Sequence, residues 1–167
     1  MMTAMQISKS ARYPKVLGDF GEHLVCNWLS RSGFEASVVD YTGIDIVAYN
    51  RELGERIGIS VKSRSRLPGK EAESVYLLRG PEDRDRLMAA CKFFGCHPWV
   101  AVYVESEHTG DLFLASLETY DRNYRTDAPT QGWGMTQKQL ERYKADANVR
   151  HIHVAFSANN WWPEAAA

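Results

Sequence analysis

The sequence predicts one α/β domain whose mixed β-sheet is flanked by helices. Three observations support this class: an amphipathic helical segment near the start, a charged β-hairpin after it, and an unbroken apolar strand further along the chain. A chain of 167 residues can build one full core but not two comfortable ones. We therefore expect a mobile N-terminal tail over residues 1–13 and a single domain over residues 14–167.

The first helix is predicted to begin near Pro14 or Lys15. Its apolar residues recur with a period of about 3.6, and Gly33 ends the segment as a C-terminal cap would. Glu22 borders the apolar stripe and is either a solvated helix residue or a side chain directed along the sheet. A strand over residues 34–40 should follow. The apolar stripe consists of Leu17, Phe20, Leu24, Val25, Trp28 and Leu29.

A β-hairpin is predicted next, because two apolar runs, 44–49 and 57–61, flank a polar segment that contains Gly54. Each run carries one unexpected charge, Asp45 within the first and Lys62 at the end of the second. A carboxylate inside an apolar strand is costly unless it is paired, hydrogen-bonded or bound to a cation. Asp45 therefore needs a partner.

The register of the hairpin decides what that partner is. In an antiparallel pair the numbers of facing residues have a constant sum, and a loop over 51–54 would set Asp45 opposite Ser60. A loop over 52–55 would set Asp45 opposite Lys62 instead. Either register brings the acid, the hydroxyl and the amine to one face of the sheet. They form either a structural salt bridge or a functional site.

Later elements follow from similar patterns. A short strand is expected over 74–78, and a helix should open at Pro81 and stop at Gly95. The apolar run 99–104 is typical of a central strand covered on both faces. Another strand is expected over 111–117.

The C-terminal part is less regular. Residues 118–134 show no period, and their aromatic side chains either pack beneath the loop or stack on nucleic-acid bases. A capping box at Thr136 opens a polar helix to about Asn148. In the last strand His151 and His153 point the same way and could bind zinc. No cysteine or acid stands near them in sequence, which favours a surface pair.

The composition excludes several classes of protein. It is 44% hydrophobic and 25% charged, as in ordinary folded proteins, and no apolar run approaches the ~20 residues of a membrane span. We expect no membrane association. The start of the chain lacks the apolar segment of a secretory signal, and the three cysteines, which lack metal-binding spacing, are expected to be reduced. These features favour a cytoplasmic protein.

Basic side chains concentrate after the hairpin, although the net charge is only −1. Residues 62–70 hold four cations and no acid, which would suit a phosphate backbone but is also usual in a solvated loop. Further arginines lie among the aromatic residues of the segment 118–134. The nucleic-acid contacts predicted beyond the hairpin are Arg64, Arg66, Lys70, Arg122 and Arg125.

The order helix, three strands, helix, strand, with Glu22, Asp45 and Lys62 in place, resembles the PD-(D/E)XK nuclease superfamily, which includes Holliday junction resolvases. The resemblance covers roughly residues 16–117, and the Gly-x-x-Gly-Glu run at 18–22 is similar to resolvase-like members. It implies a restriction-endonuclease-like three-layer fold with an αβββαβ core. It also implies a metal-dependent nuclease that cuts DNA phosphodiester bonds, and related nucleases often act as homodimers.

The resemblance implies a role for each residue of the hairpin site. Asp45 and the carbonyl of Val61 would hold Mg²⁺ or Mn²⁺, and Glu22 would bind the ion directly or through water. Lys62 would position or deprotonate the attacking water. Ser60 is the departure, because the family has an acid or a glutamine there and a hydroxyl is a much weaker ligand for a hard cation.

This departure in the third strand leaves three explanations open. The remaining two acids suffice for a nuclease with a weakened metal site. Alternatively, the domain is a catalytically inactive nuclease-fold protein that binds nucleic acid or serves as a scaffold. In the third explanation an acid from elsewhere in the chain supplies the lost charge, and the candidates are Glu55, Glu73 and Glu105.

Overall fold

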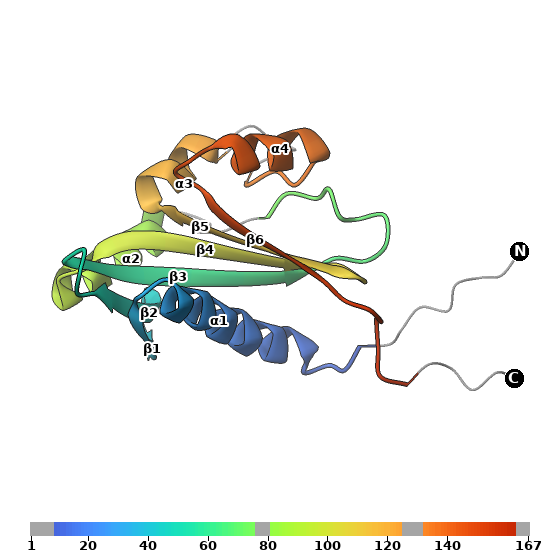
Figure 1. Ribbon diagram of the computed structural model, residues 1–167, viewed down its shortest axis with the longest axis horizontal. Coiled ribbons are helices and arrows are strands. Elements are labelled where there is room, and N and C mark those ends of the chain that lie inside the picture. The colour runs from blue at the N-terminus through green and yellow to red at the C-terminus, as the bar shows by residue number, and fades with distance from the viewer. Residues whose placement is uncertain (1–8, 76–80, 125–131, 163–167) are drawn as a thin grey trace, which may run out of the picture.

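The protein consists of one six-stranded mixed sheet between two layers of helices (Figure 1). The structure, a computed structural model, describes residues 9–75, 81–124 and 132–162. The strands lie in sequence order across the sheet. The β3–β4 pair is parallel and the other pairs are antiparallel. The helices are α1 (Tyr13–Arg31), α2 (Pro81–Phe94), α3 (Leu117–Asn123) and α4 (Gln137–Ala145). The strands are β1 (Glu35–Tyr41), β2 (Ile44–Asn50), β3 (Glu55–Ser65), β4 (His97–Glu105), β5 (Thr109–Ser116) and β6 (Arg150–Ala155).

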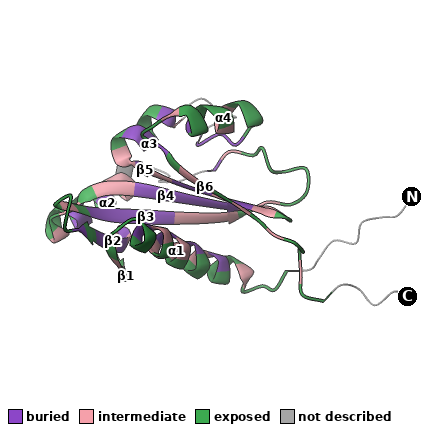
Figure 2. Ribbon diagram, in the orientation of Figure 1, coloured by how far each residue is buried: buried purple, intermediate pink, exposed green. Residues whose placement is uncertain are grey.

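Each face of the sheet has its own hydrophobic core, as expected for the three-layer architecture. Helix α1 covers one face, and α3 and α4 lie over the other (Figure 1), where α2 also contributes its apolar side. Buried residues run along β3 and β4 in the middle of the sheet (Figure 2). The α1 core includes Leu17, Val25, Leu29, Ile46, Ile59 and Val61. The opposite core includes Leu87, Val102, Phe113, Tyr120, Trp133 and Tyr143.

Helix α1 confirms the amphipathic helix predicted from the sequence. Gly33, just beyond its end, has a φ of +84°, a conformation that glycine adopts without strain. Tyr13, predicted as the last residue of the tail, is instead the first residue of the helix, and its hydroxyl donates to Glu105. Residues 1–8 of the expected tail lie outside the described part of the chain. The buried residues of α1 recur every four positions, at Leu17, Gly21, Val25 and Leu29.

The hairpin register is the one predicted for a loop over 51–54. Ile46 faces Ile59 in the β2–β3 ladder, and every pair of partner numbers adds up to 105. Continuing this register sets Asp45 opposite Ser60. Since side chains alternate along a strand, Lys62 lies on the same face as both. The register therefore confirms that the sequence places the acid, the hydroxyl and the amine on one side of the sheet.

The strand predicted over 74–78 does not form within the described residues. Val75 makes an isolated bridge to Trp133, and residues 76–78 lie outside the described part. The bridge consists of two backbone hydrogen bonds of 2.8 and 3.0 Å. This short contact attaches the segment after β3 to the segment before α4, rather than extending the sheet.

Residues 118–134 were predicted to be irregular, and that prediction is wrong for their first part, where α3 forms. Ser116 caps this helix by accepting a hydrogen bond of 3.2 Å from the Thr119 N–H. A helix of seven residues is too short to show a hydrophobic period in the sequence. Tyr120 and Trp133 are buried and stack at 5.4 Å, so these two aromatic residues pack in the core and are not available to bases.

The capping box predicted at Thr136 is present and opens α4. This helix ends at Ala145, earlier than the predicted end near Asn148, because Asp146 already has an extended backbone with ψ of 112°. None of the helices in the described ranges has the combination of length and apolar character that crossing a membrane requires.

Candidate active site

The candidate site lies where β2 and β3 separate. Their ladder ends at the pair Ile46–Ile59. Just beyond it, the Asp45 carboxylate accepts a hydrogen bond of 2.6 Å from the backbone N–H of Val61. A side chain thus satisfies a backbone donor at the point where strand pairing stops. The bond fixes Asp45 at this position, which we call the β2–β3 fork.

The charge of Asp45 is only partly balanced by its neighbours. Burial is the strongest influence and raises the pKa of the carboxyl group above its ordinary value. The Val61 N–H and the Lys62 ammonium lower the pKa, whereas the charge of Asp40 raises it further. Because the increase prevails, the fork holds a carboxylate whose ionised form is under-stabilised. A bound cation would provide the missing stabilisation.

Helix α1 brings Glu22 into the electrostatic field of the fork. The pKa of Glu22 is raised, first by partial burial and then by neighbouring carboxylates, of which Asp45 has the largest effect. A carboxylate whose pKa is raised by a neighbouring carboxylate is more costly to ionise unless a cation offsets the repulsion. The charge of Asp45 therefore reaches Glu22, although α1 packs on the face of the sheet opposite Ser60 and Lys62.

The close approach of α1 to β3 depends on Gly21. A Cβ atom at Gly21 would lie 2.1 Å from Ser63 Oγ, so the helix and the strand meet where there is no side chain. One turn earlier, Gly18 has nothing within 4 Å of the corresponding position. The residue after Gly21 is Glu22, so this contact sets the distance between the glutamate and the sheet.

Asp40 is an acid of the fork that sequence reasoning missed. It lies in an irregular part of the β1–β2 ladder, between the pair Val38–Ile46 and the pair Tyr41–Ile44. Its φ of +45° is the one positive value among the described residues other than glycine. Bulges of this kind redirect side chains, and aspartate is among the few residues that tolerate the left-handed conformation.

The field of Asp40 reaches both other acids of the fork. Its charge raises the pKa of Asp45 and also that of Glu22. Three carboxylates, from β1, β2 and α1, are therefore linked electrostatically at the fork. The one hint in the sequence is that Asp40 stands directly before the Tyr41-Thr42-Gly43 turn. The alternation of side chains along β1 does not indicate that this acid lies near the fork.

The three acids proposed from sequence as replacements lie elsewhere. Glu55 faces Asn50 at the opposite end of the hairpin. Glu105 pairs with Ser65, and both of its carboxylate oxygens accept hydrogen bonds from tyrosine hydroxyls. Glu73 is exposed and forms an ion pair of 3.1 Å with Lys70. Asp40 is therefore a better candidate for the missing charge than any of these three.

Ser60 and Lys62 complete the face of the fork. Ser60 is 4% exposed, so its hydroxyl lies inside the protein opposite Asp45. Lys62 is half-buried, and its charge acts on the Asp45 carboxyl group. The arrangement offers oxygen donors beside a single amine. Hard divalent cations such as Mg²⁺ and Mn²⁺ prefer such donors, so the residues present fit the expected metal.

The arginines predicted to contact nucleic acid differ in what their side chains bind within the protein. Arg64 lies two residues beyond Lys62 on the same face, and its guanidinium donates to the Ser63 carbonyl at 2.8 Å. Arg66 instead holds the following loop, because its guanidinium donates to the carbonyls of Glu73 and Ser74 at 3.1 and 3.2 Å. Burial lowers the pKa of Arg66. Arg66 therefore has a structural role that its place in a basic run does not suggest.

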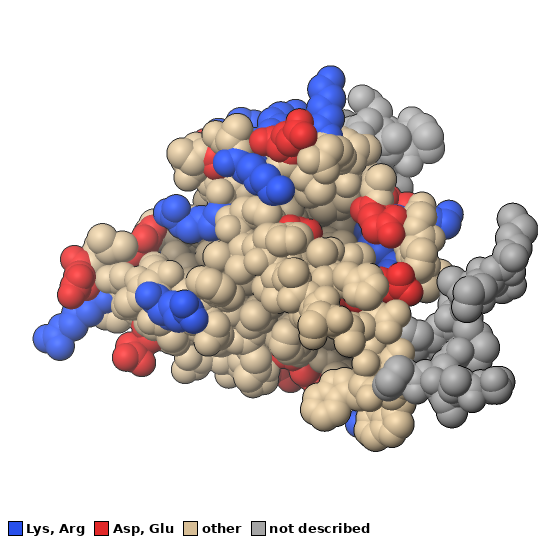
Figure 3. All heavy atoms as spheres, turned by 45° about the vertical axis from the view of Figure 1, so that its right-hand side comes forward, with Lys and Arg blue, Asp and Glu red and all other residues tan. Residues whose placement is uncertain are grey.

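Of the remaining predicted cations, the two that the structure describes each lie near an acid. Lys70 pairs with Glu73, and Arg122 on α3 lies 3.8 Å from Asp146. Arg125 lies outside the described residues. On the face shown in Figure 3, basic and acidic side chains are interspersed. Electrostatic attraction of DNA would therefore depend on a few cations near the fork.

Comparisons with known proteins bear on the fold. No protein-family model matches the chain, and the search of curated proteins gave no significant match. Among solved structures, the chain is similar to the Holliday junction resolvase Hjc of Archaeoglobus fulgidus, an archaeal hyperthermophile. The TM-score is 0.51 at 20% sequence identity, over 75% of this chain and 88% of that chain. This similarity confirms the predicted α/β fold of the restriction-endonuclease-like type.

Proposed function

We propose that this protein is a divalent-metal-dependent nuclease that cuts DNA phosphodiester bonds at the β2–β3 fork. The observation that carries the proposal is the hydrogen bond from Val61 to Asp45, which holds an under-stabilised carboxylate where the strands part. Glu22 and Asp40 add negative charge at the same place, and Lys62 adds an amine. The fold shared with an archaeal resolvase supports DNA as the substrate class.

Asp45, Asp40 and Glu22 would hold Mg²⁺ or Mn²⁺, with the carbonyl of Val61 as a further ligand. Both ions prefer oxygen ligands and keep several bound waters, which a partly open fork allows. When bound, the ion stabilises the negative charge that develops on the phosphate as the bond to the leaving oxygen breaks. In this proposal Asp40 supplies the charge that Ser60 lacks.

Lys62 would position the attacking water and contact the phosphate. Its ammonium carries three donor hydrogens and lies on the same face as Asp45. One hydrogen can orient the water while another approaches a non-bridging phosphate oxygen, where charge grows during the reaction. Ser60, opposite Asp45, offers a hydroxyl that can hydrogen-bond in the site without adding charge. Lys62 is therefore the residue that links the metal ligands to the substrate.

The first substrate to test is a four-way DNA junction, because the structural neighbour is a Holliday junction resolvase. Arg64 lies two residues beyond Lys62 on the same face and, in this proposal, would contact a phosphate of the bound strand. Separating a four-way junction into two duplexes requires cuts in two of its four strands, so we also propose that two copies of the chain act together as a homodimer. Sedimentation with and without junction DNA measures that assembly.

The decisive experiment compares cleavage of labelled junction and linear duplex DNA by the natural protein and by Asp45→Asn. Cleavage should require Mg²⁺ or Mn²⁺, and the substitution should abolish it because a metal ligand and its charge are lost. Glu55→Gln is the matched control, since it removes an acid from the far end of the same hairpin and should leave the rate unchanged.

Two results would overturn the proposal. Cleavage that persists with a chelator, or in Asp45→Asn, would contradict metal-dependent chemistry at the fork. Junction binding without cleavage under any divalent ion would instead identify a nuclease-fold protein that has lost activity. In that case, Ser60→Asp tests whether the position opposite Asp45 is the missing part, since it restores an acid there.

A further inference from the structure

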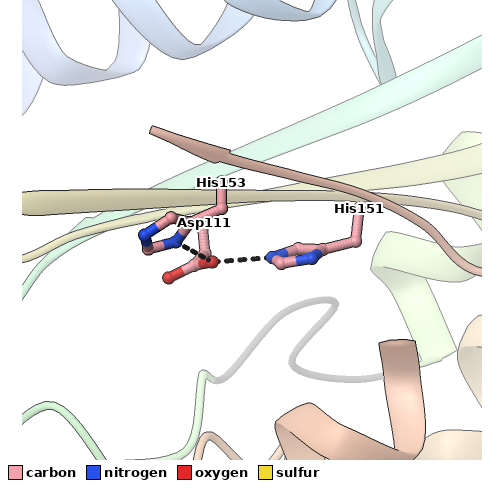
Figure 4. A group of neighbouring side chains, drawn as sticks. All are labelled: Asp111, His151 and His153. Atoms are coloured by element: carbon pink, nitrogen blue, oxygen red, sulfur yellow. Dashed lines mark hydrogen bonds and ion pairs between the residues drawn. The ribbon is translucent and has the colours of Figure 1, made fainter. Parts of the chain in front are cut away.

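A second group of metal-binding side chains lies on the β5–β6 side of the sheet. Asp111 on β5 faces His153 on β6, and His151 lies two residues earlier on the same face. Asp111 Oδ1 lies 2.6 Å from His151 Nε2 and 2.9 Å from His153 Nδ1. Figure 4 shows the two imidazole rings directed at the one carboxylate. The three donor atoms lie within 4.8 Å of one another.

The surroundings hold two of these side chains in place and leave the third open. The side chain of His151 is 12% exposed, and its ring stacks on Phe113 with a centroid distance of 4.6 Å. The Asp111 side chain is 22% exposed, whereas that of His153 is 51% exposed. A rigid pair of donors with an accessible third donor gives an ion both a preformed site and a path of entry.

We propose that Asp111, His151 and His153 bind Zn²⁺. Two imidazoles and one carboxylate are typical zinc ligands, and a set of three leaves a fourth position for water or another ligand. Mg²⁺ and Ca²⁺ favour sites made of oxygen atoms, so the imidazoles select against both. We call these three residues the β5–β6 group. The surface pair of histidines predicted from sequence did not include Asp111, because that residue is 42 positions away from His153.

The ionic form of Asp111 suits this role. Burial acts to raise its pKa, but the hydrogen bonds and charges of His151 and His153 outweigh burial, so the pKa is lowered. Each imidazole must present a lone pair to the ion in place of an N–H directed at the carboxylate. A neutral histidine does so by carrying its proton on the other ring nitrogen.

The β5–β6 group is separate from the fork and does not depend on the proposed nuclease activity. A cross-strand row on one face runs from Arg64 through Val104 and Asp111 to His153. Across the sheet, β5 with Asp111 is three strand spacings of about 4.8 Å, or about 14 Å, from β2 with Asp45. Paired catalytic metals lie about 4 Å apart, so the group cannot hold the second ion of such a pair. It is a metal site in its own right.

The test is binding of Zn²⁺ and Co²⁺ to the full chain after treatment with a chelator. Calorimetry should give one Zn²⁺ site per chain in the presence of excess Mg²⁺, and Co²⁺ should produce visible absorption of a site with nitrogen ligands. His153→Ala should weaken binding by at least about 10- to 100-fold, the range seen when even an outer-shell partner is lost. Because His153 is half-exposed, this variant should fold normally.

His97→Gln is the matched control, since His97 is an exposed histidine at the start of β4 and lies outside the group. It should bind Zn²⁺ with unchanged affinity, as should Asp45→Asn at the fork. Unchanged Zn²⁺ affinity in both His153→Ala and Asp111→Asn would overturn the proposal, as would absence of Zn²⁺ binding by the natural chain. Either result would leave the group as a hydrogen-bonded structural network.

Discussion

The β2–β3 fork and the β5–β6 group lie on the same face of one sheet but collect different donor atoms. At the fork, Asp45 accepts the hydrogen bond from Val61, and the charges of Asp40 and Asp45 raise the pKa of Glu22. The β5–β6 group gathers two imidazoles around a single carboxylate. Oxygen-only sites suit Mg²⁺ and Mn²⁺, whereas imidazoles favour zinc. One sheet can therefore keep two kinds of ion apart by the side chains at its two ends.

The two regions also differ in how the backbone builds them. The β5–β6 group uses an uninterrupted antiparallel ladder, in which Asp111 faces His153 directly. The fork uses interruptions: the β2–β3 ladder stops before Asp45, and the β1–β2 ladder is irregular at Asp40. Regular pairing brings only facing residues together, whereas an interrupted ladder lets side chains from three elements converge. The site proposed for catalysis is the irregular one.

The largest difference expected between the regions is the effect of Lys62→Ala. Lys62 has no counterpart in the β5–β6 group, and its amine is proposed to act on water and phosphate. Its loss should lower the cleavage rate by about 10²- to 10³-fold, the cost of removing one donor that stabilises transition-state charge. The Mg²⁺ concentration for half-maximal rate should change little, because Lys62 is not a ligand. A large shift in that concentration with an unchanged maximal rate would contradict the assigned role.

Much of the fork could be predicted because its geometry is local. The length of the loop between two strands fixes their register, so Asp45, Ser60 and Lys62 could be assigned to one face from residue numbers alone. Helix α1 was predictable from its period, which also placed Glu22 beside the buried stripe. The order of these elements was sufficient to predict the fold class, which the resolvase structure confirms.

The parts that escaped prediction depend on exceptions to periodicity or on distant pairing. The left-handed backbone of Asp40 interrupts the alternation of β1, so no period points to that side chain. Asp111 meets His151 and His153 only because β6 pairs with β5, which the sequence does not specify. Arg66 looked like its basic neighbours, and only the fold of the following loop directs its guanidinium to the carbonyls of that loop.

A second prediction tests whether Asp40 is the third acid of the fork. Asp40→Asn removes the charge but keeps a residue that tolerates a φ of +45°. The Mg²⁺ concentration for half-maximal cleavage should rise about 10- to 100-fold, the cost expected for weakening a metal site. Zn²⁺ binding at the β5–β6 group should not change. An unaltered Mg²⁺ dependence would remove Asp40 from the site, and Ser60→Asp in the Asp40→Asn background should recover part of the lost affinity.

A third prediction concerns α1, which covers the face of the sheet opposite Ser60 and Lys62. Gly21→Ala would place a Cβ atom 2.1 Å from Ser63 Oγ, so the free energy of unfolding should fall by about 1–3 kcal/mol. Gly18→Ala is the matched variant, because its position is open and alanine favours the helix by about 1 kcal/mol. Urea unfolding of both variants measures the difference. Equal effects of the same sign would show that α1 does not approach β3 through Gly21.

The smallest expected effect concerns the arginines of the basic run that follows the fork. Arg64 lies in the cross-strand row that ends at His153, and a phosphate contact there would release about one counterion. Arg64→Ala should therefore reduce the salt slope of junction binding by about one unit, measured by fluorescence anisotropy across salt concentrations. Compared with Arg64→Ala, Arg66→Ala should change the salt slope less and lower the free energy of unfolding more. The reason is that the Arg66 guanidinium donates hydrogen bonds to the Glu73 and Ser74 carbonyls. A larger slope change in Arg66→Ala, with stability unchanged, would mean that the basic run contacts DNA through Arg66 and that its loop contacts are dispensable.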